Sequence, residues 1–300
     1  MTPETTTPET TPRLFCFGLG YSANVLARGL LTEGWRIAGT CRDGVSRDAL
    51  TAQGIEAHVF DGQSPLEDFD AALAGTTHLL SSAPPSDNGD PVLRLHGPHI
   101  AAMTSLQWVG YLSTTGVYGD RDGAWVDETS PLKPTGARGQ RRVEAEQQWL
   151  ALWRDHAAPV HIFRLAGIYG PDRNQINAVR TGEAKRIDKP GQVFSRIHVD
   201  DIAAVLRASM SRPDPGAIYN ICDDEAAPPG DVIAYIAAQL GLEPPPLTPF
   251  NAAELSPMAQ SFYRDNKRVS NRRIKAELGV ALKWPTYREG ITALLTCDSS

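Results

Sequence analysis

A strand that runs directly into a glycine-rich turn, and from there into a helix, constrains this chain more than any other feature. The apolar segment 13–17 precedes Gly18, Gly20 and Ala23, which have the spacing G-x-G-x-x-A. Gly18 permits the tight turn, Gly20 lets a pyrophosphate approach the backbone, and the small Ala23 lets the helix pack against the strand. The N–H groups at the helix N-terminus favour phosphate, so the motif predicts a dinucleotide site. The cofactor contacts predicted from this turn are Gly18, Gly20, Tyr21, Ser22 and Ala23.

The composition excludes several classes of protein. With 300 residues, of which 41% are hydrophobic, the chain can bury the core of one large domain or two coupled domains. A net charge of −6 argues against a nucleic-acid binder, and no apolar run is long enough to cross a membrane. The four scattered cysteines form no disulfide framework, the histidines show no metal-ligand spacing, and no secretory signal is visible. We therefore expect a cytoplasmic protein with a small-molecule substrate and no metal.

Strand patterns alternate with helix patterns along most of the chain. The expected strands are 13–17, 35–40, 55–60, 78–82, 108–113, 160–165 and 217–221, and the main expected helices are 47–53, 92–104, 140–155, 200–211 and 231–240. This alternation predicts an α/β fold of the Rossmann type, with a doubly wound parallel sheet.

The domain boundaries follow from composition. Residues 1–12 repeat a Thr-Pro-Glu-Thr unit without an apolar residue after Met1, which predicts a disordered tail. Residues 13–170 form the dinucleotide-binding domain, completed by roughly 200–222. The loop-rich segments 171–199 and 223–300 are expected to form a small substrate-binding cap over the carboxyl ends of the strands.

The end of the second strand indicates which dinucleotide is bound. NAD-selective folds carry an acid at this tip, whereas this chain has Thr40 and Arg42, with Asp43 following directly. Arg42 can pair with a 2′-phosphate and Thr40 can add a hydroxyl donor, so NADP(H) is preferred over NAD(H); the alternative is a solvated loop arginine. Asp61, after the third strand, either accepts from the adenine amino group or is an ordinary turn residue. Ser82, at the end of the fourth strand, completes the predicted cofactor site.

Five motifs occur in the order and spacing of a known family. They are Gly18–Ala23, Ser113–Gly119, Arg164–Pro171, Ile197–Asp201 and Tyr219–Asp223. The chain resembles the extended and atypical short-chain dehydrogenases/reductases, the NAD(P)-dependent epimerase/dehydratase-like proteins. The resemblance implies a Rossmann domain with a small C-terminal substrate domain, and oxidoreductase or epimerase chemistry.

The catalytic residues implied by the resemblance are a Ser/Thr, a Tyr and a Lys. Thr114 matches the Ser/Thr, whereas Arg138 and Arg142 stand where the family has its Tyr and Lys. Because arginine stays protonated in proteins, Arg138 cannot exchange the proton that the tyrosine would exchange. Arg142 can still donate hydrogen bonds to the nicotinamide ribose, and hydride transfer is the cofactor's own chemistry.

The proton must then come from another group. Tyr118 is the first candidate, because the tyrosine at this place in the family pattern can face the substrate; the alternative is a tyrosine packed under the cap. Tyr169 and His198 are further candidates. His198 can instead anchor the cap through Asp200 or Asp201.

Arginines also indicate the substrate. Arg138, Arg141 and Arg142 form a basic cluster that is either a solvated helix start or a site for an anionic substrate. Arg196 and His198 are predicted substrate contacts near the mouth of the cleft. We expect an NADP(H)-dependent oxidoreductase or epimerase-like protein acting on a carbonyl or hydroxyl group, with an anionic compound or a nucleotide sugar as substrate. The alternative is a non-catalytic NADP(H)-binding sensor or scaffold.

Oligomeric state stays open. Related proteins often form homodimers through the helices that here start near Val92 and Gln140. The apolar residues Trp149 and Trp153 on the second of these helices fit either a homodimer interface or the core.

Overall fold

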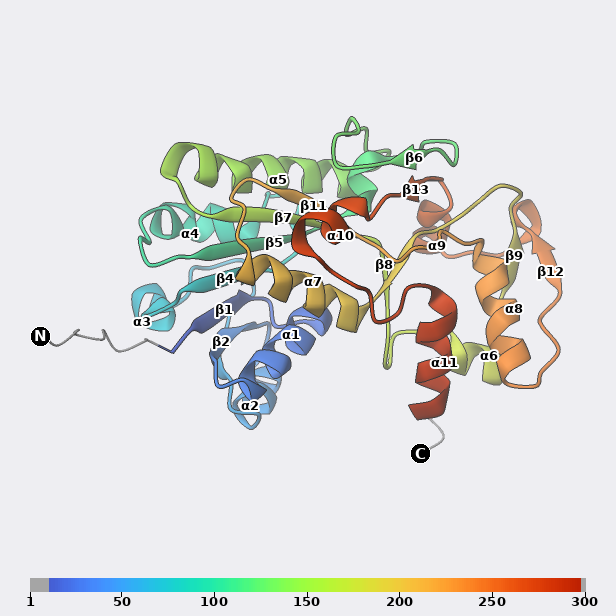
Figure 1. Cartoon of the computed structure of the whole chain (residues 1–300), viewed down its shortest axis with the longest axis horizontal. Coiled ribbons are helices and arrows are strands. Elements are labelled where there is room, and N and C mark those ends of the chain that lie inside the picture. Colours follow the sequence, from blue (N-terminus) through green and yellow to red (C-terminus); the bar gives the residue numbers. More distant parts are fainter. Residues whose placement is uncertain (1–10, 298–300) are drawn as a thin grey trace, which may run out of the picture.

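The computed structural model describes residues 11–297, so residues 1–10 of the predicted tail lie outside the described residues. A sheet of seven parallel strands forms the centre of the molecule, in the order β11-β7-β5-β4-β1-β2-β3 (Figure 1). The strands are β1 (Arg13–Phe17), β2 (Arg36–Cys41), β3 (Glu56–Val59), β4 (His78–Ser81), β5 (Trp108–Thr114), β7 (Val160–Leu165) and β11 (Ile218–Ile221). The doubly wound Rossmann-type sheet predicted from the sequence is confirmed.

Helices cover both faces of this sheet. One apolar core joins it to α1 (Tyr21–Thr32), α2 (Gly44–Thr51) and α7 (Val199–Ser211). A second core joins the opposite face to α3 (Phe69–Leu73), α4 (Pro91–Ala101) and α5 (Ala137–His156). Trp149 and Leu152 on α5 are buried in this second core, while Trp153 is 38% exposed and packs over Gly216.

A third core belongs to the cap, which lies at one end of the sheet domain (Figure 1). It includes Tyr169, Ile176, Ile236 and Ile291. The cap elements are β8 (Gly167–Tyr169), α6 (Ile176–Arg180), β9 (Arg186–Asp188), β10 (Arg196–His198), α8 (Pro229–Gln239), β12 (Leu247–Pro249), η2 (Phe250–Ala252), α9 (Pro257–Phe262) and α11 (Tyr287–Cys297).

Part of the segment assigned to the cap returns to the sheet domain. After β13 (Arg268–Val269), which pairs with β6 (Trp125–Val126), helix α10 (Arg272–Leu278) packs against β11 and α7. Ile274 and Leu278 are buried in the same core as β1. The predicted boundary at 223 therefore needs correction for residues 268–280, because their apolar side chains cover the edge strand of the sheet. Helical periodicity reports an apolar face but not which core receives it.

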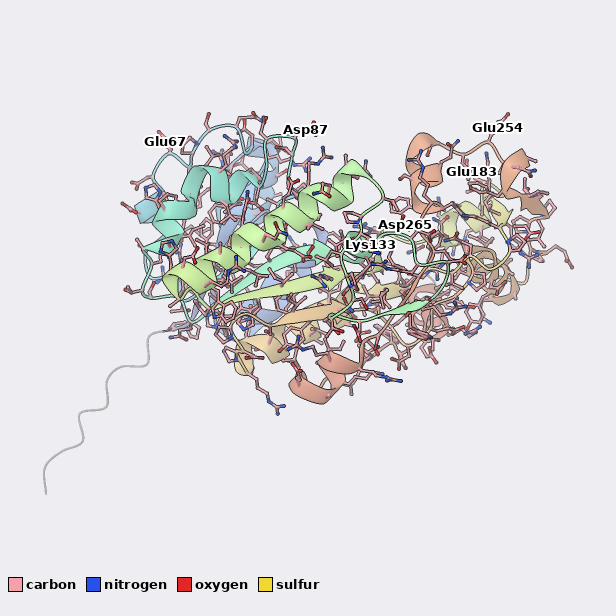
Figure 2. All side chains as sticks on the ribbon, turned by 90° about the horizontal axis from the view of Figure 1, so that it is seen from above. Glu67, Asp87, Lys133, Glu183, Glu254 and Asp265 are labelled. Atoms are coloured by element: carbon pink, nitrogen blue, oxygen red, sulfur yellow. The ribbon has the colours of Figure 1, made fainter. Side chains whose placement is uncertain are left out.

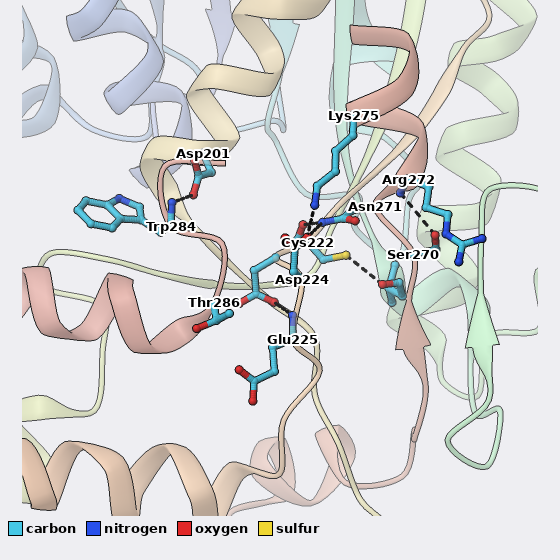
Figure 3. A network of polar contacts seen from close by, with 12 residues as sticks. Asp201, Cys222, Asp224, Glu225, Ser270, Asn271, Arg272, Lys275, Trp284 and Thr286 are labelled. Carbon is cyan, nitrogen blue, oxygen red and sulfur yellow. Dashed lines mark hydrogen bonds and ion pairs between the residues drawn. The ribbon is translucent and has the colours of Figure 1, made fainter. Parts of the chain in front are cut away.

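Polar contacts hold this returning segment in place (Figure 3). Asn271 Nδ2 donates to the Cys222 carbonyl at 2.9 Å and to Asp224 Oδ1 at 2.7 Å, and Lys275 pairs with the same carboxylate. The Trp284 N–H donates to Asp201 Oδ2 at 3.1 Å. Asn271 occupies the N-cap position of α10, but its side chain ties β11 to α10 instead of capping the helix.

Within the described part of the chain, every helix is too short or too polar to span a membrane.

Candidate functional site

A cleft of about 1780 Å³ opens between the carboxyl edge of the sheet and the cap. Gly20 after β1, Ser82 after β4 and Thr114 at the end of β5 line it from the sheet side. Tyr169 and Arg196 line it from the cap side. Ligands of open α/β sheets bind outside the carboxyl ends of the strands, so the cleft lies where such a fold places its ligand.

The glycine turn is built by contacts with the neighbouring strands. Gly18 has φ +85°. Its N–H donates to Thr40 Oγ1 at 2.8 Å, and Ser82 Oγ donates to its carbonyl. Thr40 is buried, with its hydroxyl used in this turn. The prediction that Thr40 donates to a 2′-phosphate is therefore wrong.

The space in front of Gly20 suits a phosphate group. A Cβ added at Gly20 would meet no atom within 4 Å, and no side chain caps the N-terminus of α1. The first N–H groups of a helix have no acceptor within it, and they favour an anion. Tyr21 and Ser22 line the cleft beside them, while Ala23 is fully buried against the sheet. The turn and the helix start thus fit the pyrophosphate of a dinucleotide.

Arg42 and Asp61 lie beyond the residues that line this cleft. Arg42 follows β2, is exposed, and makes no hydrogen bond or ion pair with any described residue. Asp61 is exposed after β3, where its carboxylate accepts from the Gln63 N–H at 2.8 Å. Arg42 is therefore free to receive an anionic group, whereas the Asp61 carboxylate is partly used by its own turn.

Thr114, Arg138 and Arg142, the predicted catalytic residues, all line the cleft. Thr114 Oγ1 accepts from the Gly116 N–H at 3.1 Å, at the start of η1 (Thr115–Tyr118). The Arg138 side chain is exposed and forms no hydrogen bond or ion pair with another described residue. Arg142 is held: its Nη1 donates to the Leu112 carbonyl at 2.6 Å and to the Tyr111 hydroxyl at 3.1 Å.

Tyr118 does not line the cleft. Its side chain is fully buried, its hydroxyl donates to Asn220 Oδ1 at 2.7 Å, and it accepts from Arg164 Nη1 at 2.9 Å. Burial raises the pKa of Tyr118 to about 12. The prediction of Tyr118 as the proton donor is therefore corrected: it packs in the core and joins β11 to β7.

His198 is likewise structural. It is 3% exposed, and its ring packs between Tyr169 and Trp284. Its Nδ1 accepts from the Asp200 N–H at 3.1 Å, which caps α7, and burial lowers its pKa. The predicted substrate contact at His198 is corrected accordingly. Arg196, predicted with it, does line the cleft.

The cleft is positive although the protein is acidic. Among the described residues that line it, one is acidic, Asp265, and seven are basic: Arg138, Arg141, Arg142, Arg173, Arg196, Arg264 and Lys267. Lys267 Nζ lies 3.2 Å from Asp265 Oδ2, and burial lowers the pKa of Lys267. Figure 2 labels Asp265, the one acidic residue among the described residues that line the cleft.

Sequence reasoning missed Ser113, Arg173, Arg264 and Lys267 as lining residues. Arg173 lies over the Tyr21 ring, 5.6 Å from its centroid, so it links the cap loop to the start of α1. For Arg264 and Lys267, the sequence did contain one indication, since both lie in the charged run 264–268 of a loop-rich segment. Within the described part of the chain no group of three or more His, Cys, Asp or Glu residues could hold a metal ion.

Comparisons with known proteins bear on the family and the fold of this chain. The family model described as "NAD dependent epimerase/dehydratase family" matches residues 49–222. Protein YeeZ of Escherichia coli is 30% identical over 243 residues, covering 76% of this chain and 84% of that protein.

Two solved structures illustrate the structural likeness. A conserved protein of unknown function from Silicibacter pomeroyi is 56% identical, with a TM-score of 0.89 over 96% of this chain and 99% of that one. The dTDP-glucose 4,6-dehydratase of Bacillus anthracis, solved with NAD, is 16% identical, with a TM-score of 0.76 over 97% of both chains. The second likeness concerns the fold alone.

Proposed function

Because the chain belongs to the NAD-dependent epimerase/dehydratase family, we propose that it is an NADP(H)-dependent oxidoreductase or epimerase-like enzyme that acts on a carbonyl or hydroxyl group of an anionic substrate. The observation that carries this proposal is the continuous cleft. It runs from the open N-terminus of α1, past Thr114 and Arg138, to Arg196 in the cap. One ligand at the helix start and another at the cap end would meet near Thr114.

The preference for NADP(H) rests on Arg42. Its guanidinium is exposed at the tip of β2 without a partner among the described residues. A guanidinium presents paired donors that match a phosphate group, so a 2′-phosphate would satisfy it. The NAD bound to the Bacillus anthracis dehydratase lacks this phosphate, and the tip of β2 in this chain carries no acid for a ribose 2′-hydroxyl.

The residues near Thr114 support the chemistry. A bound nicotinamide supplies hydride transfer. The Thr114 hydroxyl orients the substrate oxygen. Arg142, fixed by the Leu112 carbonyl and the Tyr111 hydroxyl, directs its remaining donors to the ribose hydroxyls. Arg138, unpaired and exposed in the cleft, orients an anionic substrate.

The alternative, a non-catalytic sensor or scaffold, is supported by the lack of an evident proton donor among the described residues of the cleft. Neither arginine at the family's Tyr and Lys positions can exchange a proton, and neither Tyr118 nor His198 lines the cleft. Tyr169 does line it, but burial raises the pKa of Tyr169, which disfavours its ionised form. A protein of this kind would bind NADP(H) tightly without turning over a carbonyl.

A fluorescence titration of the full chain with NADPH, and separately with NADH, tests the proposal. We expect NADPH to bind more tightly, and Arg42→Ala to lose about tenfold or more in NADPH affinity while NADH affinity changes little. Arg154→Ala, near the far end of α5, is the matched control. If neither nucleotide binds, both the proposal of an enzyme and the alternative of a sensor are contradicted. Multiple turnovers of NADPH with a carbonyl fraction of a cell extract would exclude the sensor.

A further inference from the structure

The cap end of the cleft contains an arginine without an acidic partner. Arg196 Nη1 donates to two backbone carbonyls, those of Phe194 at 2.8 Å and Ala227 at 3.1 Å. Within residues 11–297 it forms no ion pair with a carboxylate. Its side chain lines the cleft beside Tyr169 of the paired strand β8. A partly buried guanidinium whose charge is unbalanced favours an anion from outside.

A buried carboxyl group lies next to this arginine. The Asp223 N–H donates to the Arg196 carbonyl at 2.7 Å, yet no ion pair joins the two side chains. Asp223 is 3% exposed; its Oδ1 accepts from the Glu225 N–H at 3.3 Å, while its Oδ2 has no hydrogen-bond partner. Burial raises the pKa of Asp223 to about 8, against the lowering effect of Arg196. At neutral pH this carboxyl is therefore mostly uncharged.

Neighbouring acids are neutralised by other partners. Asp224 pairs with Lys275 on α10, as Figure 3 shows, and Glu225 pairs with Arg288 on α11. The remaining titratable groups that act on Arg196 or Asp223 are Tyr169 on β8, Tyr287 on α11, Tyr263 after α9, and Cys222. Burial raises the pKa of each of them above its usual value, which leaves them uncharged at neutral pH. The charge of Arg196 is therefore left for a ligand.

We propose that Arg196 binds an anionic group of the substrate, a carboxylate or a phosphoryl group, and that the buried Asp223 beside it, with its unpartnered Oδ2, controls this affinity. The inference rests on the proposed function and names the anionic part of its substrate. Once Asp223 loses its proton, its negative charge balances Arg196 and competes with the ligand. At a pH above the pKa of Asp223, binding of the anion is therefore coupled to the uptake of one proton per site, and Asp223 takes up this proton. Asp223 acts through Arg196, so it is a positioning residue.

Isothermal titration of the full chain with malonate and with sulfate, between pH 6.5 and 9.5, tests this inference. These probes represent the carboxylate and the phosphoryl group, and neither changes charge over this range. Each titration is run with and without saturating NADPH. We expect one probe to bind, with an affinity that is level below pH 7 and falls towards tenfold per pH unit above about pH 8.

Three variants separate the parts of the inference. Arg196→Gln should lose at least about tenfold in anion affinity. Arg264→Gln, at an exposed arginine elsewhere in the same cleft, should lose less than about threefold and is the matched control. Asp223→Asn should bind the anion at every pH without the fall above pH 8. Thermal unfolding midpoints and NADPH binding verify that each variant is folded.

The outcomes that overturn the inference are specific. The proposed anion subsite at Arg196 is contradicted if neither probe binds at any pH. It is also contradicted if Arg196→Gln and Arg264→Gln lower the anion affinity equally. A pH profile that is unchanged in Asp223→Asn removes the role of Asp223 and assigns the fall to another group, such as Lys267. If NADPH does not bind while the Arg196-dependent anion does, the proposed function fails and the subsite stands.

Discussion

Arg164 and Glu146 form a bidentate ion pair inside the core, in which Arg164 Nη2 lies 2.7 Å from Glu146 Oε2 and Nε lies 3.1 Å from Oε1. Their side chains are 3% and 2% exposed. Ser113 Oγ, at the floor of the cleft, donates to Glu146 Oε1 at 2.5 Å, and Arg164 also donates to the Tyr118 hydroxyl. The pair therefore connects α5, β5 and β7 directly beneath the candidate site.

Breaking this pair from one side should destabilise the protein strongly. Arg164→Met leaves the Glu146 carboxylate buried without its partner, which we expect to lower the free energy of unfolding by about 3–5 kcal/mol. Replacing both residues, as Glu146→Leu with Arg164→Met, should recover most of this loss because no charge stays buried. Urea unfolding of the wild type, of Arg164→Met and of the double variant measures these free energies. A single variant within about 1 kcal/mol of wild type would mean that water reaches the carboxylate.

Tyr118 shows where prediction from sequence ends. The local motif places it directly after the strand that carries Thr114, and this position alone favours a tyrosine facing the substrate. Its orientation is decided instead by Arg164 and Asn220, which lie 46 and 102 residues further along the chain. Nothing in the local pattern reports such long-range partners.

The glycine turn and the parallel strands were predictable because their signals are local. A positive φ at Gly18, strand length and helical periodicity act within a few residues. The lining residues Arg173 and Lys267 come from loops, whose course depends on the packing of the cap rather than on any period. The sheet and its glycine turn follow from the sequence, whereas the cap residues that line the cleft, apart from Arg196, require the fold.

Gly20 and Gly18 should respond differently to the same substitution. Gly20→Ala meets no atom within 4 Å, so its thermal midpoint should stay near that of wild type. Its methyl group would occupy the space proposed for the pyrophosphate, so NADPH affinity should fall by about tenfold or more. Gly18→Ala, with φ +85° and Ser82 Oγ 3.0 Å from the new Cβ, should instead lose stability, by about 1–3 kcal/mol.

Differential scanning fluorimetry with and without NADPH reads both effects. The nucleotide should raise the midpoint of wild type and of a control, Thr32→Ala at the exposed C-terminal end of α1, more than that of Gly20→Ala. If NADPH raises the thermal midpoint of Gly20→Ala as much as that of wild type, the phosphates of the nucleotide do not bind at this turn.

Thr114→Val should separate turnover from cofactor binding. The substitution keeps the shape of the side chain and removes the hydroxyl that we propose orients the substrate oxygen. We expect kcat to fall by about a hundredfold or more while NADPH affinity stays within about threefold. The substitution also removes the acceptor of the Gly116 N–H, so Thr114→Ser, which retains a hydroxyl, is the control. NADPH oxidation in the presence of a carbonyl-containing fraction of a cell extract measures turnover. Normal turnover in the valine variant would refute this mechanism.

Buried histidines should make stability depend on pH between about 4 and 6.5. Burial lowers the pKa of His78, His96 and His161 to about 4. Below pH 6.5 the unfolded chain therefore binds protons that the folded protein excludes, and stability is lost as the pH falls towards 4. Each such histidine contributes a slope of about 1.4 kcal/mol per pH unit. Carboxyls such as Asp90 and Asp201, whose pKa is raised by burial, oppose this trend.

His96 allows one contribution to be isolated. Its Nε2 accepts from the Leu66 N–H at 3.1 Å, so the folded state holds this nitrogen unprotonated. In His96→Gln the amide oxygen can accept the same bond but does not titrate in this range. Between pH 6 and 4.5 the unfolding free energy of this variant should fall less steeply than that of wild type, by about 1.4 kcal/mol per pH unit. His156→Gln, at the exposed end of α5, is the control. Equal slopes in wild type and His96→Gln, measured by urea unfolding, would mean that His96 takes up its proton in the folded protein as readily as in the unfolded chain.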